Sequence, residues 1–424
     1  MAYGFSPKQP LPTIKFPPLE EWQQPVFDDY KSELYDIQVI KAKRQVGKSL
    51  TCIYIALYAA FKTNNSISAI VEPTLAQGRR VYKQLLKSIG GESSPLVRTA
   101  NSTLLEIEFS NGSQIIFKSA EQGEQALRGL TVKKGVLIID EGAFIDDAIY
   151  EVLYPTVDAT RSKIIIVSTP LFESGEFYKK YMEGLPKGPG RPSKYRKVKS
   201  YNWSKYDTSK YLSEEKLEYY RERLSPLRFR SEYEGEFIKE GSYVMGNLDS
   251  IIGLYSTSKP KFGGLDWGNG GENDFTVMIL LDAGGNVTGI YPKNNLQPSE
   301  QIEYFSTLIN AQTLQALQVE TNSIGTVYMD LLQGKTTTYI QGFNTSNESK
   351  RRIIEQLISA IQQHLITIPN DPELIKQLQH FNIEKTKTGY TYNGNGAHDD
   401  YVIALALAYD AYLNNAGGFE ITYA

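Results

Sequence analysis

The tripeptide Gly47-Lys48-Ser49 constrains the fold of this chain most, because of what surrounds it. A short β-prone run, residues 37–43, precedes it, and an apolar stretch without helix breakers, residues 49–61, follows it. In a phosphate loop, backbone N–H groups surround the phosphates, the lysine reaches the β- and γ-phosphate oxygens, and the hydroxyl binds Mg²⁺. The same tripeptide also occurs in surface turns, and Ala42 stands where the usual pattern has its first glycine. The strand before it and the helix after it favour a loop that binds nucleotide phosphates.

A second element of this site follows downstream. Residues 136–139 are a continuous apolar run that ends in Asp140 and Glu141, as expected where a buried strand delivers two carboxylates. Asp140 is placed to hold Mg²⁺ through water, and Glu141 to orient and deprotonate a water that attacks the γ-phosphate. The next apolar run ends in Ser168 and Thr169, whose hydroxyls suit a γ-phosphate sensor or a simple strand-ending turn. We therefore predict that the N-terminal half is an ATPase.

Strand and helix patterns alternate throughout this half. Residues 66–73 and 163–167 predict further strands, residues 75–89 predict a helix, and residues 103–119 predict a hairpin that turns at Asn111-Gly112. Continuous apolar strands are expected in the centre of a parallel sheet that is covered on both faces. The sequence therefore predicts an α/β fold with a three-layer sheet in the N-terminal half.

Composition limits the compartment and the partners. A chain of 424 residues is long enough for two or more domains. Its net charge of −3 argues against a generally basic surface, so any contact with DNA must come from local patches. Cys52 is the single cysteine, which excludes an internal disulfide and favours an intracellular compartment. The apolar runs fall short of a membrane span, so we expect no membrane partner.

Acidic residues recur at element ends in the C-terminal half. Asp266 lies in a predicted strand, Glu320 ends the strand over residues 314–319, and Asp399-Asp400 open an apolar helix. Two strands and one helix N-terminus can meet at one point, and carboxylate oxygens suit hard divalent cations such as Mg²⁺ or Mn²⁺. Two such ions can activate water and stabilise the leaving 3′ oxygen of a cut DNA strand. One of the paired aspartates can instead cap the helix, and Asp274 is a further candidate ligand.

Four short segments together resemble the large terminase subunit of tailed bacteriophages. They are residues 43–49 (Lys-Arg-Gln-Val-Gly-Lys-Ser), Ala126-Leu127-Arg128-Gly129, Asp140-Glu141 and Ser168-Thr169-Pro170. That family commonly departs from the first Walker glycine and carries an arginine in the loop, as Ala42 and Arg44 do here. The resemblance extends over roughly residues 20–415 and implies an ASCE-type P-loop ATPase domain followed by an RNase H-like nuclease domain with a mixed sheet.

The resemblance also implies roles for individual residues. Gln23 or Gln24 would read the adenine edge, and either Arg44 in cis or Arg128 from a neighbouring subunit would reach the γ-phosphate. The remaining ATP-site residues are Gln45, Val46, Gly47, Lys48, Ser49, Asp140, Glu141, Ser168 and Thr169, with Ser49 and Asp140 on the metal. The nuclease metals would be held by Asp266, Asp274, Glu320, Asp399 and Asp400.

The implied function is a viral DNA-packaging motor. ATP hydrolysis would drive double-stranded DNA into a procapsid, and the nuclease would cut concatemeric DNA. We predict an ATPase domain over residues 1–200, a linker over 201–257 and the nuclease over 258–424. The expected partners are double-stranded DNA, a portal protein, a small terminase subunit and further copies of the chain in a ring, commonly of five. The chain would act in the host cytoplasm and can be a monomer when isolated.

Two other functions remain as alternatives. A helicase-nuclease of DNA repair would be expected to carry a second motor domain, and no second strand pattern of that kind follows residue 170. A non-catalytic docking subunit would be expected to have lost catalytic residue types, and each expected type is present. An ATPase assay with and without DNA separates these alternatives from the packaging motor.

Overall fold

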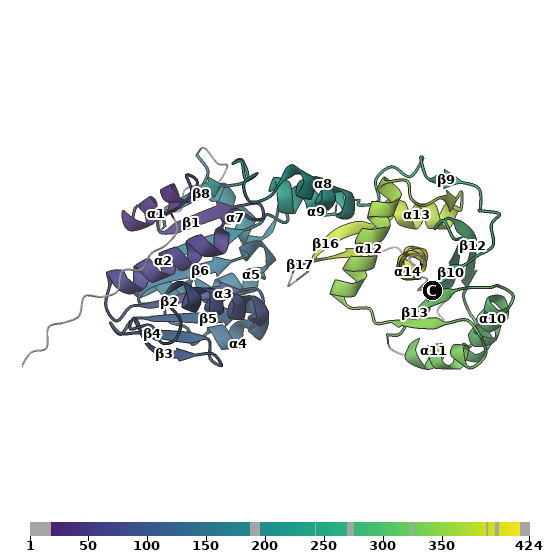
Figure 1. Ribbon diagram of the computed structural model, residues 1–424, viewed down its shortest axis with the longest axis horizontal. Coiled ribbons are helices and arrows are strands. Elements are labelled where there is room, and N and C mark those ends of the chain that lie inside the picture. Colours follow the sequence, from purple (N-terminus) through teal and green to yellow (C-terminus); the bar gives the residue numbers. More distant parts are fainter. Residues whose placement is uncertain are drawn as a thin grey trace, which may run out of the picture. The chain divides into compact units, whose positions relative to one another are not determined.

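The computed structural model describes residues 18–186, 196–241, 243–268, 275–322, 325–386, 389–394 and 398–415. The chain forms two compact units (Figure 1). The first unit runs to Glu214 and also includes Arg230–Lys239 and Thr386–Gly389. The second unit comprises Glu215–Phe229, Glu240–Lys385 and the chain from Tyr390 onward.

An eight-stranded sheet is the framework of the first unit, in the order β3-β4-β5-β2-β6-β7-β1-β8. Its strands are β1 (Ile37–Lys41), β2 (Ile67–Glu72), β3 (Val97–Asn101), β4 (Glu106–Phe109), β5 (Gln114–Ser119), β6 (Lys134–Asp140), β7 (Lys163–Ser168) and β8 (Val198–Asn202). The six strands from β5 to β8 in this order pair in parallel, and only β3 and β4 run antiparallel to their neighbours. The carboxyl ends of the parallel strands therefore share one edge of the sheet.

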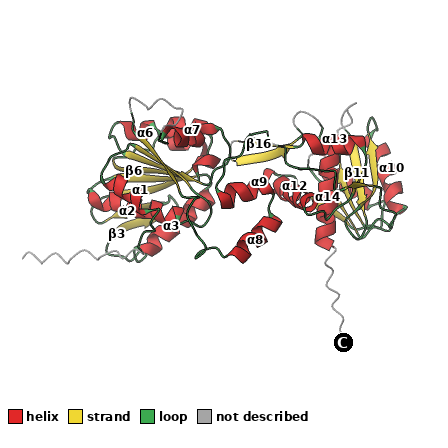
Figure 2. Ribbon diagram, turned by 90° about the horizontal axis from the view of Figure 1, so that it is seen from above, coloured by secondary structure: helices red, strands yellow, loops and turns green. Residues whose placement is uncertain are grey.

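Helices cover both faces of this sheet, which confirms the predicted three layers. Figure 2 shows α1, α2 and α3 on one side and α6 and α7 on the other. Neighbouring residues of one strand enter different cores: Ile138 packs with the first group of helices and Ile139 with the second. The helices are α1 (Gln24–Lys31), α2 (Lys48–Lys62), α3 (Leu75–Ser88), α4 (Gly123–Leu127), α5 (Asp147–Leu153), α6 (Pro155–Asp158) and α7 (Gly175–Glu183).

The predicted hairpin is present but begins later than residue 104. β4 starts at Glu106, because Leu105 adopts a left-handed backbone with φ 55° that a strand cannot contain. The turn at Asn111-Gly112 is as predicted. Gly112 has φ 80°, and a Cβ at this position would lie 2.2 Å from Oδ1 of Asn65, so glycine is required there.

A five-stranded mixed sheet is the framework of the second unit, in the order β12-β11-β10-β13-β14. β10 pairs in parallel with β13, and β13 with β14, whereas β11 and β12 run antiparallel to their neighbours. The strands are β10 (Phe262–Asp266), β11 (Thr276–Leu281), β12 (Val287–Lys293), β13 (Ala316–Glu320) and β14 (Ile340–Phe343). Two small sheets pair β9 (Ile252–Gly253) with β15 (Ile368–Pro369), and β16 (Asn382–Thr386) with β17 (Gly389–Asn393).

The long helix α14 (Asp400–Asn415) is the centre of this unit (Figure 1). It is buried over Asp400–Ala411, as its apolar sequence predicts. A Cβ on Gly264 of β10 would lie 2.2 Å from the carbonyl oxygen of Ala404, so glycine allows the helix to lie directly on the strand. The other helices are α8 (Glu214–Arg223), α9 (Pro226–Phe229), α10 (Pro298–Asn310), α11 (Gly325–Gln333), α12 (Asn347–Gln362) and α13 (Pro372–His380). No helix in the described ranges combines the length and apolar character needed to cross a bilayer.

Candidate active sites

The phosphate loop connects the end of β1 to the start of α2, as predicted. Gly47 has φ 81°, and a Cβ there would lie 2.4 Å from Nε2 of Gln23. The start of α1 holds the loop in place: Nε1 of Trp22 donates to the carbonyl of Val46 over 3.0 Å, and Nε2 of Gln23 donates to the same carbonyl over 3.2 Å. Gln24 points elsewhere and donates to Asp28. The structure therefore brings Gln23, and not Gln24, to the loop.

The loop faces the carboxyl end of β6. Nζ of Lys48 lies 2.8 Å from Oε1 of Glu141, and Oγ of Ser49 donates to Oδ2 of Asp140 over 3.3 Å. These four side chains come from two segments that are 91 residues apart in the sequence. The lysine, the hydroxyl and the two carboxylates of the predicted site thus meet.

Glu141 is held by both neighbouring segments. Its Oε2 accepts hydrogen bonds from the backbone N–H and the hydroxyl of Thr169, at 3.2 and 3.1 Å, and from Oγ of Ser168 at 3.2 Å. Burial acts to raise the pKa of Glu141, but Lys48 and the bonds from Thr169 outweigh it and lower that pKa below its usual value. The carboxylate is therefore ionised at neutral pH and oriented by the two predicted sensor residues.

Two further carboxyls beside Glu141 behave differently. Burial, then the charge of Glu141, raises the pKa of Asp140 to about 6. Glu72, the last residue of β2, is 1% exposed, and burial followed by the charges of Asp140 and Glu141 raises its pKa well above the usual range. Its Oε1 has no hydrogen-bond partner among the described residues. The sequence analysis did not assign Glu72 to the site, although an acidic residue at the end of the strand that follows the phosphate loop in the sequence was a usable signal.

The two arginines that could reach the γ-phosphate, Arg44 and Arg128, pair with different carboxylates. Arg44 forms a two-pronged ion pair with Glu232, at 2.8 and 3.1 Å, and its backbone N–H donates to the carbonyl of Glu232 over 2.7 Å. Arg128 has a side chain that is 68% exposed, pairs with Glu124 over 3.1 Å, and lines an open cavity on the surface of the first unit. Nothing in the sequence points to Glu232, because 188 residues separate it from Arg44.

In the second unit, Asp266 and Glu320 lie side by side. β10 and β13 are parallel neighbours with Leu265 opposite Val319, so the residues that follow end both strands at the same edge. Asp266 is 7% exposed. Burial raises its pKa well above the usual range, and so do the charge of Glu320, a hydrogen bond shared with it, and the charges of Asp400 and Asp399. Glu320, Asp399 and Asp400 therefore lie near enough to Asp266 to affect its pKa.

Asp399 and Asp400 have different surroundings. The carbonyl of Asp399 accepts the backbone N–H of Ile403 over 2.9 Å, which makes it the first acceptor of α14, and its carboxylate pairs with Lys350 over 2.8 Å. Asp400 is buried, and its Oδ2 accepts the N–H of Phe275 over 3.1 Å. Asp274 lies outside the described residues. Sequence reasoning also missed Lys350, a lone basic residue in a helix without a local signal.

The chemistry of these groups fits a hard divalent cation, because every candidate ligand offers carboxylate oxygen. Within the described ranges, which leave out Asp274, no three His, Cys, Asp or Glu side chains are close enough to ligate one ion. Burial first, and then the neighbouring carboxylates, raise the pKa of Asp266, and a cation between the carboxylates would offset their mutual repulsion.

A phosphate loop facing an acidic strand end in one unit, and converging carboxylates on a mixed sheet in the other, define an ATPase joined to a nuclease. Two family models match the chain: "Terminase large subunit, T4likevirus-type, N-terminal" over residues 39–248 and "Terminase RNaseH-like domain" over residues 263–411. The large terminase subunits of Thermus phage G20c and Thermus virus P23-45 are each 24% identical over 419 residues, covering 88% of this chain and 84% of theirs.

A solved structure shows the same fold. The large terminase of a thermophilic bacteriophage superposes with a TM-score of 0.66 at 14% identity, covering 94% of this chain and 99% of that one. The chain belongs to the large terminase subunits of tailed bacteriophages. It is a DNA-packaging motor with ATPase and nuclease domains, and the predicted P-loop and RNase H-like folds are confirmed. The repair helicase-nuclease and the non-catalytic docking subunit are not favoured.

Proposed function

We propose that Lys48, Ser49, Asp140 and Glu141 form the centre that hydrolyses ATP, and that Asp266, Glu320 and Asp400 form the centre that cuts DNA. The observation that carries the first half is the 2.8 Å contact between Lys48 and an ionised Glu141. The observation that carries the second half is the pairing of Asp266 with Glu320 on adjacent parallel strands.

At the ATP centre each side chain has a separate task. Lys48 and the N–H groups of residues 45–49 would bind phosphate oxygens, and Ser49 and Asp140 would hold Mg²⁺, which would neutralise charge on those oxygens. Glu141 would take the proton of the attacking water at its carboxylate, which its lowered pKa keeps ionised and which Ser168 and Thr169 hold in place. Gln23 fixes the loop from outside, and its place beside Gly47 supports a contact with the nucleotide.

We assign Arg128 as the arginine that reaches the γ-phosphate of a neighbouring subunit. It lies on the surface and has one weak partner, Glu124, which a stronger anion can replace. Arg44 would first have to leave the two-pronged contact with Glu232. Arg44, acting on the nucleotide of its own subunit, is therefore the second candidate for this contact.

At the nuclease centre the carboxylates would hold two divalent ions. Mg²⁺ is the expected ion and Mn²⁺ suits the same oxygens; together two ions supply an activated water and a stabilised leaving oxygen. Asp266 and Glu320 are the shared ligands, and Asp400 is preferred over Asp399 because Asp399 is neutralised by Lys350. Asp274 remains a further candidate ligand.

The full activity needs partners. We propose double-stranded DNA as the substrate, a ring of copies, commonly five, on a portal protein, and a small terminase subunit that selects the cutting site. The chain would act in the host cytoplasm. The proposed domain limits remain residues 1–200, 201–257 and 258–424.

Steady-state ATP hydrolysis, with and without double-stranded DNA, tests the first centre, and plasmid cleavage with Mg²⁺ or Mn²⁺ but no ATP tests the second. We expect both activities in the wild-type chain, and loss of ATP hydrolysis alone in Lys48→Ala. A wild-type chain that shows neither activity, alone or with DNA and metal, would contradict the proposal.

A further inference from the structure

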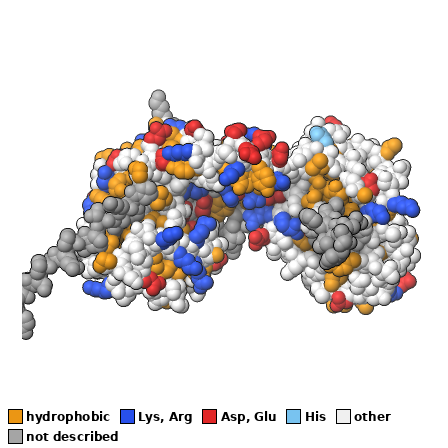
Figure 3. Space-filling model, in the orientation of Figure 1, with side chains coloured by type: hydrophobic (Ala, Val, Ile, Leu, Met, Phe, Trp, Pro, Cys, Tyr) orange, Lys and Arg blue, Asp and Glu red, His pale blue; other side chains and the backbone are white. Residues whose placement is uncertain are grey.

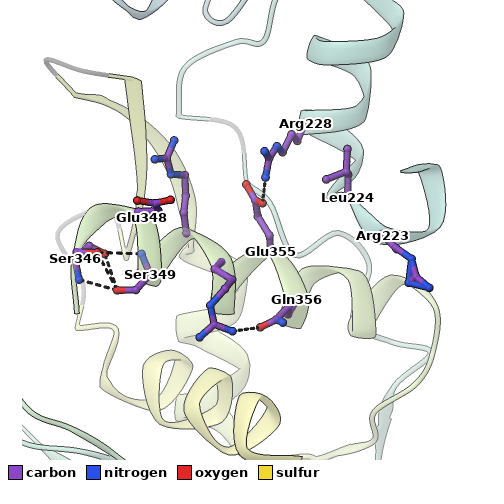
Figure 4. Close-up of a pocket in the computed structure, with 10 residues that line it drawn as sticks. Arg223, Leu224, Arg228, Ser346, Glu348, Ser349, Glu355 and Gln356 are labelled. Carbon is purple, nitrogen blue, oxygen red and sulfur yellow. Dashed lines mark hydrogen bonds and ion pairs between the residues drawn. The ribbon is translucent and has the colours of Figure 1, made fainter. Parts of the chain in front are cut away.

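A groove of about 650 Å³ lies in the second unit beside the first turns of α12 (Figure 4). α12 forms one wall, and Arg223, Leu224 and Arg228, from the end of α8 and from α9, form the other. Four arginines line it, against the two acidic residues Glu348 and Glu355. The groove is therefore a local patch of net positive charge on a chain whose net charge is −3.

Two of the four arginines are committed to the protein itself. Arg228 donates to Glu355, and Arg352 donates to Asp410, a residue of α14 that is 1% exposed. In each pair the carboxylate is buried and needs its cation, so these arginines hold the walls together.

The other two arginines, Arg223 and Arg351, are held by aromatic rings. The guanidinium of Arg223 lies 4.2 Å from the ring centre of Tyr219, and that of Arg351 lies 4.8 Å from the ring centre of Tyr390. A guanidinium that stacks on a ring keeps its N–H groups at the edge available, in a geometry that suits phosphate oxygens. These two charges are therefore the ones that a ligand can use.

The helix α12 connects this groove to the nuclease carboxylates through Lys350, which does not itself line the groove. Lys350, next to Arg351 in the sequence, reaches Asp399 at the head of α14, while the residues on either side of it line the groove. From Ser349 to Gln356 the helix advances about 10 Å. One strand of B-form DNA presents about three phosphates over that length.

We propose that this groove binds backbone phosphates of the DNA strand that the nuclease cuts, through Arg223 and Arg351. The inference rests on the nuclease function proposed above. A nearly neutral chain must contact DNA through local patches, and Figure 3 shows Lys and Arg side chains in small groups among acidic and uncharged surface. Phosphate contacts in this groove would position the strand without reading its sequence.

The test compares two double variants of the full chain. Arg223→Gln/Arg351→Gln removes the two available charges and keeps side chains of moderate length. Arg221→Gln/Lys376→Gln is the matched control: Arg221 also stacks on a ring, Phe229, and neither residue lines the groove. Nicking of plasmid DNA is measured with Mn²⁺ and without ATP, and thermal unfolding is measured to show that each variant is folded.

We expect the groove variant to raise KM for DNA with kcat unchanged, and the control to change neither. Losing two phosphate contacts lowers the slope of log(kcat/KM) against log[salt] by about 1.8. Between about 50 and 200 mM salt the wild-type kcat/KM should therefore fall about tenfold more than that of the groove variant.

Equal salt slopes in all three proteins, or a loss of kcat with an unchanged KM, would overturn the inference while leaving the nuclease assignment intact. A wild-type chain that cuts no DNA with either metal would overturn the proposed function and the inference with it.

Discussion

The two active centres both gather acidic side chains at the ends of parallel strands, but they balance the charge differently. At the ATP centre, Lys48 lies 2.8 Å from Glu141, and hydroxyl and N–H donors complete the shell. Glu141 is consequently a stronger acid than usual although it is deeply buried. At the nuclease centre, Asp266 is buried near Glu320, Asp399 and Asp400, and Lys350 pairs with Asp399. Burial, and then the charge of Glu320, make Asp266 a weaker acid than usual.

This difference shows what keeps the carboxylates of each centre charged. The phosphate loop is a site whose catalytic base is charged and oriented by the protein itself. In the second unit, burial and then the neighbouring carboxylates raise the pKa of Asp266, and a bound cation would favour its charged form. The catalytic base of the first centre is therefore charged without a metal, whereas the charge of Asp266 in the second centre would depend on one.

The largest expected effect concerns Arg128, which a neighbouring subunit would supply to the ATP centre. We expect Arg128→Ala to lower ATP turnover by about 10³–10⁵ in assembled motors while nucleotide binding stays nearly intact, since an arginine that reaches the γ-phosphate acts in the transition state. Turnover and ATP affinity are measured on the same motors. If Arg128→Ala kept wild-type turnover and Arg44→Ala lost it, Arg44 would be the arginine that reaches the γ-phosphate.

The acidity of Asp140 gives a smaller effect on the same centre. Its pKa of about 6 is raised by burial and by Glu141, and its ionised form is the one that holds Mg²⁺. ATP turnover at low Mg²⁺ should therefore fall up to about tenfold for each pH unit below that pKa. Raising Mg²⁺ should shift the fall to lower pH, because the ion stabilises the carboxylate. If Mg²⁺ did not shift the pH dependence of ATP turnover, a group other than Asp140 would control its fall at low pH.

The smallest expected effect is on stability and separates two buried aspartates of the second unit. The raised pKa of Asp266 means that its contribution to stability is present at low pH and lost as pH rises through the folded-state value. Without metal at pH above neutrality, Asp266→Asn should raise Tm by about 2–4 °C for each kcal/mol regained.

Asp282 is the matched control for that measurement. Burial acts to raise its pKa, but bonds from Ser256 and from the N–H groups of Asn286 and Gly284 lower it, so its ionised form stabilises the fold above the usual pKa and that contribution is lost as pH falls. Asp282→Asn should therefore lower Tm under the same conditions. Shifts of the same sign in both variants would contradict the charge account of the nuclease centre.

Much of this was accessible from the sequence, for identifiable reasons. Strand ends such as Asp140 and Glu320 are marked by the apolar runs before them, so their meeting at one sheet edge follows from parallel pairing. The residues that were missed lack such a mark. Glu232 and Lys350 acquire their roles from tertiary contacts, with Arg44 and with Asp399, that no local pattern specifies. The predicted start of β4 was also wrong, because a leucine gives no indication of the left-handed backbone that Leu105 adopts.

The most direct test of two independent centres is a paired measurement of translocation and cleavage. We expect Glu141→Ala to stop ATP-driven DNA translocation and to cut plasmid DNA at the wild-type rate. We expect Asp266→Ala to do the reverse, with wild-type ATP turnover and no cleavage. Loss of both activities in both variants would contradict the account.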